Sequence, residues 1–388
     1  MRKHLAITAA AGAAALIGGA IMVSVARAGD DDRSGDRMGF YKQTNLVADK
    51  AGLGAPTTDP NLVNPWGMAW APGGAAWVAN NGTGTSTLYT GKGVRFPPGN
   101  PLVVKIPGIP PNQGTPTGMV WNANPGQFQF HDSEDKDHPS SKVGAAFIFA
   151  GEDGIISAWS PSLKDTTKAV VVVPASKQAA VYKGLAFGTN GRNFIFATNF
   201  ATGEIDVYDS NFTEVSNNGK HGKMFHDPQM PKDYAPFGIQ NINNDLFVTF
   251  AKRSADKPRE EEQAGAGFGI VDVFSTDGDL LQRFASHGPL NAPWGVTLAT
   301  KGFGKFSGAV LIGNFGNGQI NAFDYRSGRL LGALQRPDGT VLAIEGLWSL
   351  AFGNFLDADS DELYFTAGIN NEEDGLFGEI APVSGKKD

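Results

Sequence analysis

Carboxamide and carboxylate side chains stand just after several short apolar segments of this 388-residue sequence. If these segments are equivalent strands of a repeated sheet, their ends converge and the polar side chains form a ring. The oxygen atoms of Asn and Glu are hard donors of the kind that Ca²⁺ prefers, and such a cation can polarise a carbonyl or phosphoryl oxygen. A lysine in the ring would add an electrophilic or phosphate-contacting group. The candidate channel-mouth residues are Asn80, Glu152, Asn199, Lys252 and Asn314, of which Glu152, Asn199 and Asn314 are candidate metal ligands.

Asparagine at a strand end also has a purely structural explanation. Asn80, Asn199 and Asn314 each begin or adjoin a turn that contains Gly, and Asn side chains stabilise such turns by local hydrogen bonds. Turn capping is therefore the favoured interpretation of the three asparagines. Glu152 is the member least easily explained in this way, because a carboxylate beside the tight turn at 151–154 is not required by the fold.

A second acidic pattern lies near the C-terminus. Asp357, Asp359 and Asp361 alternate as in the first half of a calcium loop, but the sixth position is not Gly and the twelfth is not Glu. We expect a solvated acidic turn, with a loosely held surface Ca²⁺ as the alternative. The sequence also contains neither a G-x-S-x-G nucleophile elbow nor a phosphate-binding G-x-x-x-x-G-K-[ST] loop, so two common enzyme classes have no support.

A short anchor that joins an aromatic residue or Pro to Gly recurs six times and supplies the framework for these side chains. The copies lie at 65–68, 116–119, 182–185, 236–239, 293–296 and 347–350, with Ser349 in place of Gly in the last. Their spacing of about 51 to 66 residues fits four-stranded blades rather than solenoid coils. The sequence therefore predicts an all-β, six-bladed β-propeller, and we expect the anchor tryptophans Trp66, Trp294 and Trp348 to pack between blades.

Each anchor is followed by three further strand signals, except that the sixth unit ends after its third strand. We expect Phe40–Ala48 to supply the missing strand, since this pairing closes the ring and removes an exposed sheet edge. The fourth strand of the third unit, at Lys223–Phe225, has the weakest signal. Two insertions, Gln127–Lys142 and Lys252–Gly265, are expected to be solvated loops over one face. The propeller domain spans 40–383 and a polar tail spans 384–388.

Residues 1–28 have the basic start, apolar stretch and Ala-x-Ala ending of a cleaved signal peptide, although a retained anchor is the alternative. Residues 29–39 are charged and are expected to be a disordered acidic spacer. We expect a periplasmic or extracellular monomer with no membrane span after signal removal. The formal net charge of −7, without a basic cluster, argues against nucleic acid as a partner. The absence of cysteine excludes disulfides and thiol chemistry.

Several motifs resemble an uncharacterised family of exported bacterial six-bladed β-propellers related to NHL-repeat proteins. They are Asn64–Gly67, Tyr182–Ala186, Tyr234–Gln240, Gly313–Gly316, Leu363–Gly368 and Asp374–Gly378. The resemblance covers essentially the whole chain after the leader and implies a secreted propeller without an established activity. Two departures are the lack of the C-terminal sorting segment found in many relatives and the acidic loop 357–362, where relatives have a Gly/Asn-rich turn.

The leading functional hypothesis is a module that binds an unknown extracellular ligand or protein through the loop-rich face, because recognisable catalytic groups are few. One alternative is a cation-dependent lactonase or esterase with Ca²⁺ at the central channel. A weaker alternative is carbohydrate binding in the cell envelope or matrix. Propellers support all three functions, so the fold alone does not decide among them.

Overall fold

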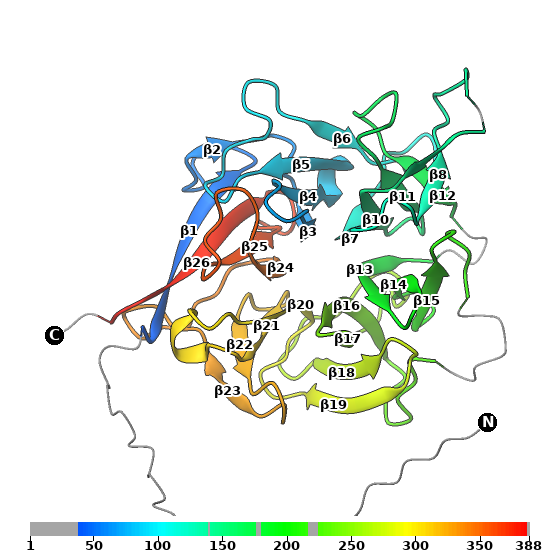
Figure 1. The fold of residues 1–388 in the computed structure, drawn as a ribbon. Coiled ribbons are helices and arrows are strands. Elements are labelled where there is room, and N and C mark those ends of the chain that lie inside the picture. The colour runs from blue at the N-terminus through cyan, green and yellow to red at the C-terminus, as the bar shows by residue number, and fades with distance from the viewer. Residues whose placement is uncertain (1–37, 139, 176–179, 216–223, 386–388) are drawn as a thin grey trace, which may run out of the picture. The chain divides into compact units, whose positions relative to one another are not determined.

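The computed structural model describes residues 38–138, 140–175, 180–215 and 224–385, within the compact unit Asp36–Asp388. The leader 1–28, most of the spacer 29–39 and residues 386–388 of the polar tail lie outside the described residues. Six antiparallel sheets stand around a common axis (Figure 1), which confirms the predicted six-bladed β-propeller. The described residues contain no α-helix, and two short 3₁₀ turns, η1 (Asn81–Thr83) and η2 (Gly304–Phe306), lie in connections.

Each blade begins with a strand beside the axis, and the predicted anchors lie in these six strands. The innermost strands are β3 (Pro65–Ala69), β7 (Pro116–Trp121), β13 (Tyr182–Thr189), β16 (Tyr234–Ile242), β20 (Pro293–Leu298) and β24 (Leu347–Phe352). Each contacts the innermost strand of the next blade, and β24 contacts β3. The ring is therefore closed.

The remaining strands follow outward in each blade. The second strands are β4 (Ala76–Asn80), β10 (Phe147–Gly151), β14 (Asn193–Asn199), β17 (Asp245–Lys252), β21 (Val310–Asn314) and β25 (Leu363–Ala367). The third strands are β5 (Thr85–Tyr89), β11 (Ile156–Trp159), β15 (Glu204–Asp209), β18 (Gly269–Ser275), β22 (Ile320–Phe323) and β26 (Leu376–Val383). The fourth strands are β6 (Val103–Lys105), β12 (Val170–Val173), β19 (Leu280–Ser286), β23 (Leu330–Ala333) and, in the sixth blade, β1 (Phe40–Ala48).

The third blade has three strands among its described residues. Of the segment predicted as its fourth strand, Lys223 lies outside the described residues, whereas Met224 and Phe225 form a turn. Phe225 has a φ of 55°, which is incompatible with extended backbone.

The N-terminal strand closes the ring as predicted. Strand β1 runs antiparallel to β26, from the pair Phe40 and Val383 to the pair Ala48 and Leu376, with one irregularity near Asn45. The two-residue strand β2 (Thr57–Thr58) extends this sheet by parallel pairing with the end of β1. The last blade therefore completes its hydrogen bonding with residues from the opposite end of the domain.

The anchor glycines are required because the innermost strands approach one another closely. A Cβ atom on Gly67 would lie 2.5 Å from the carbonyl oxygen of Thr117 in the next blade. A Cβ on Gly238 would lie 2.0 Å from the carbonyl oxygen of Trp294. Since both obstacles are backbone atoms, no side-chain rotation can relieve either clash.

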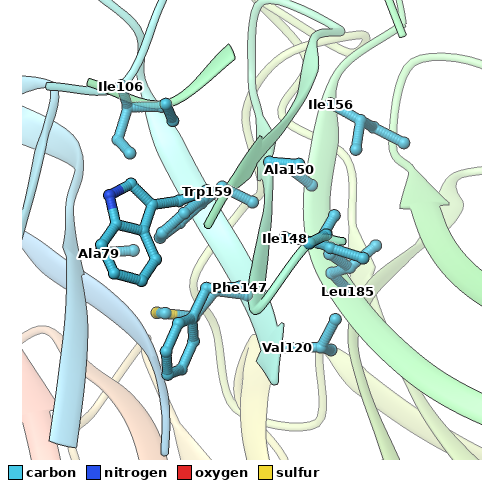
Figure 2. Packing of buried hydrophobic residues seen from close by; sticks show 14 of the residues in the cluster. Ala79, Ile106, Val120, Phe147, Ile148, Ala150, Ile156, Trp159 and Leu185 are labelled. Carbon is cyan, nitrogen blue, oxygen red and sulfur yellow. The ribbon is translucent and has the colours of Figure 1, made fainter. Parts of the chain in front are cut away.

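Apolar side chains fill the spaces between neighbouring blades. Figure 2 shows the cluster that joins the first three blades, where Ala79, Phe147 and Leu185 come from successive blades. The indole of Trp77 stacks on Phe147 at a centroid distance of 4.2 Å and lies 4.6 Å from Trp159. Trp77 of the first blade thus packs against the second blade, which contributes Phe147 and Trp159.

The two insertions leave opposite ends of the blades, which corrects the expectation that both cover one face. Gln127–Lys142 joins a first strand to a second, whereas Lys252–Gly265 joins a second to a third, and antiparallel strands place these connections at opposite ends. The former is not simply a solvated loop either. It contributes to a hairpin of β8 (Gln129–His131) and β9 (Lys142–Gly144), whose Phe130 is buried.

Candidate functional site: a charged cluster over an aromatic plug

Four aromatic side chains meet on the propeller axis. They are Trp66, Phe237, Trp294 and Trp348, and we call them the axial plug. Each is the second residue of its anchor. The rings of Trp66 and Trp348 stack with centroids 3.5 Å apart, and Trp294 meets Trp66 edge-on at 6.0 Å. This placement corrects the prediction that the anchor tryptophans pack between blades, because Trp66 also contacts Phe237 and Trp294, from blades that are not its neighbours.

Lys183 occupies the same anchor position in the third blade, and its side chain is only 4% exposed. The ammonium lies 5.2 Å from the ring centroid of Trp66 and 5.7 Å from that of Phe200. Its Nζ atom is 2.7 Å from Oε1 of Glu152 and 3.8 Å from Oε2 of Glu262. Burial disfavours the charge, but these two carboxylates outweigh it and raise the pKa of Lys183 above its ordinary value. The lysine is therefore a buried cation held by aromatic faces and carboxylates.

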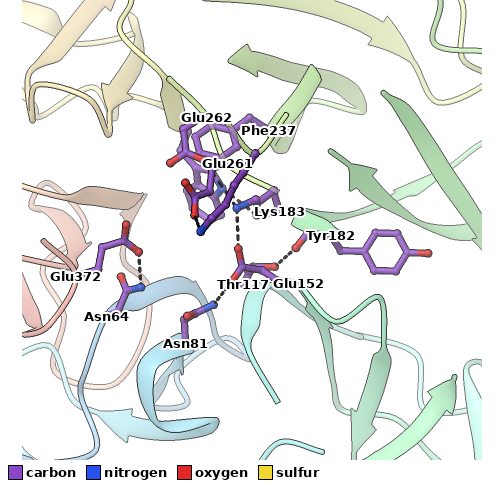
Figure 3. A network of polar contacts seen from close by, with 12 residues as sticks. Asn64, Asn81, Thr117, Glu152, Tyr182, Lys183, Phe237, Glu261, Glu262 and Glu372 are labelled. Atoms are coloured by element: carbon purple, nitrogen blue, oxygen red, sulfur yellow. Dashed lines mark hydrogen bonds and ion pairs between the residues drawn. The ribbon is translucent and has the colours of Figure 1, made fainter. Parts of the chain in front are cut away.

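Glu152 and Glu262 pair with this lysine, and Glu372 lies further away, beside Asn64 (Figure 3). Together with Lys183, the three glutamates form what we call the charged cluster. Glu152 follows β10, Glu262 lies between β17 and β18, and Glu372 lies between β25 and β26. All three connections join a second strand to a third, so they leave the same end of the propeller. Four blades contribute to the cluster, since Lys183 comes from β13.

Glu152 bridges two blades besides its own. Its Oε1 pairs with Lys183, and its Oε2 accepts a hydrogen bond of 2.9 Å from Nδ2 of Asn81 in the first blade. Both carboxylate oxygens are thus engaged, although the side chain retains 28% exposure. Glu152 is therefore more open to a molecule arriving from solvent than Lys183 or Glu262.

Glu372 is held in a strained loop. Asn370, Asn371 and Glu372 have consecutive φ values of 55°, 54° and 68°. Asparagine tolerates this left-handed region, whereas a glutamate there carries a cost of about 1 kcal/mol or more. The strain orients a carboxylate that is partly withdrawn from solvent.

The cluster contains three carboxyl groups but one ammonium group, and the pKa values of two of these carboxyl groups are raised. Burial raises the pKa of Glu262, although the ammonium of Lys183 opposes this. The pKa of Glu372 is raised to about 7, chiefly by burial and then by the negative charge of Glu262. The hydrogen bond from Asn64 acts in the opposite direction and lowers this pKa. Glu372 is therefore a carboxyl group that changes its charge near neutral pH.

A short hydrogen-bond chain connects Glu372 to the axial plug. Nδ2 of Asn64 donates to Oε2 of Glu372 at 2.6 Å, and Oδ1 of Asn64 accepts from the indole nitrogen of Trp348 at 2.9 Å. The indole nitrogen of Trp294 donates to the carbonyl oxygen of Lys183 at 2.9 Å. The indole nitrogen of Trp66 is buried and has no hydrogen-bond partner in the described part of the chain.

The structure places Glu152 in the cluster, but the three candidate asparagines are engaged locally. Nδ2 of Asn80 donates to two threonine hydroxyls of β5, and Nδ2 of Asn199 donates to Asp206 at 3.0 Å. Oδ1 of Asn314 accepts from the backbone amide of Asn291 at 3.1 Å. Each asparagine is thus held by residues of its own blade or of the segment leading into it, in line with the favoured structural interpretation, and calcium binding by these residues stays a prediction.

Lys252 lies at the end of β17 and makes different contacts from Lys183. Its ammonium is 4.3 Å from the ring centroid of Phe268 and 3.7 Å from Oδ2 of Asp233. Lys183, rather than Lys252, is the lysine in contact with Glu152. Any electrophilic role in this cluster therefore belongs to Lys183.

The acidic loop of Asp357, Asp359 and Asp361 joins β24 to β25, so it leaves the end opposite to the charged cluster. Oδ1 of Asp359 accepts the backbone amide of Asp361 at 2.9 Å, as in a self-contained turn. Among the described residues no group of three or more His, Cys, Asp or Glu side chains is arranged to hold a metal ion. Surface Ca²⁺ at this loop stays a prediction.

The channel behind the plug is narrow. A cavity of about 40 Å³ is lined by anchor glycines and by Met119, Leu185 and Trp294. It is followed by a cavity of about 280 Å³ among Trp70, Trp121 and Phe187. The first volume is close to that of one or two waters, and neither cavity is lined by a residue of the charged cluster.

The fold and cluster define a class: a closed six-bladed β-propeller with a buried lysine and three glutamates at one end of an aromatic-plugged axis. No family model matches the chain. Two uncharacterized proteins of Acanthamoeba polyphaga mimivirus are 32% and 30% identical to it over 343 and 350 residues. The alignments cover 88% of this chain in both cases, and 80% and 85% of the relatives. The chain belongs to the family of these proteins, and the bacterial membership expected from its motifs is not confirmed by them.

A solved structure with a TM-score of 0.50 supports the fold alone. The aldose sugar dehydrogenase of Escherichia coli in its apo form is 12% identical, with 88% of this chain and 99% of that chain covered and a TM-score of 0.50. Virginiamycin B lyase from Staphylococcus aureus is also 12% identical, with the same coverage and a TM-score of 0.49. In the described ranges, none of the helices has the length and apolar character needed to cross a membrane.

Proposed function

We propose that the protein is a binding module that takes a small ligand at the charged cluster. The observation that carries this proposal is the buried Lys183, held by Glu152 and Glu262 above the axial plug. Buried ion pairs are poor sources of stability, because the cost of removing both charges from water offsets their attraction. An anchor position that is aromatic in four blades would be filled more favourably by another aromatic residue if packing were its sole role.

The strained loop supports the same conclusion. Left-handed backbone at Glu372 costs free energy, and the carboxylate it orients adds negative charge to a cluster that already has an excess. Such local costs are concentrated at binding and catalytic sites. A ligand that interacts with the cluster would offset them.

Matched glutamate variants test this proposal. Glu152→Gln removes the charge but keeps an oxygen for Asn81, and Glu134→Gln removes a solvent-exposed glutamate that lies 3.8 Å from Lys168. Melting temperatures of the wild type and both variants are measured with a panel of amines, neutral sugars, carboxylates and Ca²⁺. We expect at least one class to stabilise the wild type and Glu134→Gln but not Glu152→Gln. Stabilisation that is equal in all three proteins would place binding elsewhere and refute the proposal.

A hydrolase is the second candidate function, supported by one observation. The carboxyl group of Glu372 has a pKa of about 7, which suits proton transfer near neutral pH, and the nearby ammonium of Lys183 can stabilise a developing oxyanion. In the cation-dependent form, Ca²⁺ would join the cluster and polarise the ester or lactone carbonyl. The wild type and Glu372→Gln are assayed on lactones and phosphoesters with and without EDTA. Turnover that is lost in the variant would support this function.

We also propose that the protein acts as a monomer outside the cytoplasm. The basic, apolar and Ala-x-Ala segments of residues 1–28 support export, and the acidic composition fits a soluble secreted domain. N-terminal sequencing of the protein from an expressing culture should find a start at Gly29 in the periplasm or medium. Recovery of the uncleaved chain from membranes would favour the retained anchor.

A further inference from the structure

The charged cluster already contains a cation, and the way this cation is held shows what chemistry the site accepts. The ammonium of Lys183 lies within 6.0 Å of the ring centroids of Trp66, Phe200 and Phe237 and is paired with two carboxylates. Aromatic faces combined with carboxylates are the usual surroundings of alkylammonium and guanidinium groups in proteins. The surroundings are therefore built for organic cations.

One carboxylate of the cluster has no cation in direct contact, although the more distant charge of Lys183 acts to lower its pKa. Glu372 accepts its hydrogen bond from the neutral carboxamide of Asn64 and forms no ion pair with any residue in the described ranges. Two basic groups of the 252–265 insertion are engaged elsewhere: Lys257 pairs with Glu261, and Arg253 donates to the carbonyl oxygens of Ala201 and Pro258. A cationic ligand would thus find an available partner in the carboxylate of Glu372.

A metal ion fits this arrangement less well than an organic cation. Ca²⁺ needs six to eight oxygen ligands, whereas Nζ of Lys183 already lies 2.7 Å from Glu152 and would repel a divalent ion placed between the glutamates. A single positive charge spread over an ammonium or guanidinium group repels Lys183 less and donates hydrogen bonds to a carboxylate. Burial and the neighbouring glutamates raise the pKa of Glu372, so an added cation would lower it again and release a proton near pH 7.

We propose that the ligand of this site carries a primary ammonium or guanidinium group that pairs with Glu372 beside Lys183. This inference rests on the proposed function, since it names the chemical class that the binding module takes. It makes Glu372 the residue that determines specificity and Lys183 a fixed cation that orients Glu152.

Calorimetric titration of the whole protein with small probes tests this inference. The probes are n-butylammonium and n-butylguanidinium, with n-butanol, butyrate and Ca²⁺ for comparison. We expect both organic cations to bind at least ten-fold more tightly than n-butanol or butyrate. Binding should tighten between pH 6 and pH 8, and titrations at pH 7 in buffers of different ionisation enthalpy should reveal proton release.

Two neighbouring glutamates supply the variants. Glu372→Gln keeps an oxygen for Asn64 but removes the charge, and we expect it to weaken binding of the organic cations at least ten-fold and to abolish proton release. Glu373→Gln removes an exposed charge from the same loop and should leave both unchanged. Melting curves of both variants show whether each is folded before titration.

The outcomes separate this inference from the proposed function. If n-butanol, butyrate or Ca²⁺ binds in preference to the organic cations, and Glu152→Gln abolishes that binding, the organic-cation inference fails while the binding module stands. If the organic cations bind equally well to the wild type, Glu372→Gln and Glu152→Gln, they bind elsewhere, and both proposals are contradicted. If no probe binds the wild type at millimolar concentration, the inference is overturned.

Discussion

The substitution Glu372→Gln should change how the stability of the protein depends on pH. The pKa of this carboxyl is raised from 4.5 to about 7 in the folded state, so the folded state holds the proton more tightly than the unfolded state. The group makes no difference to stability well below pH 4.5. As pH rises from there through about 7, ionisation costs the folded state progressively more, and the unfolding free energy falls.

The expected magnitude follows from the size of the shift. At 1.36 kcal/mol per pKa unit, the full penalty above pH 8 is about 3 kcal/mol, of which less than about 1 kcal/mol is already present at pH 5. Glu372→Gln removes this penalty and keeps a side-chain oxygen for Asn64. The difference in unfolding free energy between the variant and the wild type should therefore increase by about 2 kcal/mol, in favour of the variant, from pH 5 to pH 8.

Urea unfolding at pH 5, 6.5 and 8 measures this difference. Carboxyl groups outside the cluster are common to both proteins and cancel in the comparison. Besides burial, the charge of Glu262 raises the pKa of Glu372, so removing the charge of Glu372 also eases the ionisation of Glu262 and adds to the gain in stability at high pH. Glu373→Gln is the matched control, and its unfolding free energy should depend on pH in the same way as that of the wild type. If Glu372→Gln also runs parallel to the wild type across this range, the carboxyl is not held in the environment described, and the electrostatic argument for the cluster fails.

Three further predictions concern ring closure, blade spacing and the buried lysine. Deletion of Phe40–Ala48 leaves β26 as an unpaired edge, so the product should aggregate or lose cooperative melting; a soluble, cooperatively melting product would contradict the closure. Gly238→Ala places a Cβ 2.0 Å from the carbonyl oxygen of Trp294. It should lower the free energy of unfolding, measured in urea, by about 3 kcal/mol or more. In the control Gly126→Ala the Cβ would meet a side-chain oxygen at 3.2 Å, so the loss should be far smaller. Lys183→Ala leaves glutamates without their cation and should lower the melting temperature, since breaking a buried ion pair costs about 3 to 5 kcal/mol. Added n-butylammonium should restore part of the loss and n-butanol should not; equal recovery with both would mean that packing, not charge, is what the lysine supplies.

The fold is predictable from the sequence because its repeats carry physical constraints. The anchor glycines recur because neighbouring innermost strands leave no space for a Cβ, and the N-terminal strand Phe40–Ala48 has the predicted bounds because the last blade lacks a strand. The weak fourth-strand signal near Phe225 fails because that residue adopts a left-handed turn. Positive φ at an aromatic residue has no signature in the hydrophobic pattern.

The site is predictable only in part, since its residues come from different kinds of sequence. Glu152 directly follows a strand that the sequence pattern predicts. Because the ends of equivalent strands converge, its place near the channel mouth can be predicted. Glu262 belongs to an insertion without a repeat counterpart, and Glu372 is oriented by three consecutive left-handed residues. Neither position follows from periodicity, because each depends on a loop conformation that the sequence does not reveal.

Lys183 is different, because the signal that marks it is present in the repeats. The residue before the anchor glycine, or before Ser349 in the last blade, is Trp66, Thr117, Lys183, Phe237, Trp294 or Trp348, and all six are buried. The close approach at each glycine directs the preceding side chain to the axis, whatever its type. A lysine there cannot turn outward to solvent through the blades, so it must be neutralised by acidic groups from the loops above. Glu152 and Glu262, which pair with Lys183, supply that negative charge. A charged side chain at the axial position of a propeller repeat thus indicates both where the site lies and which charge its partners carry.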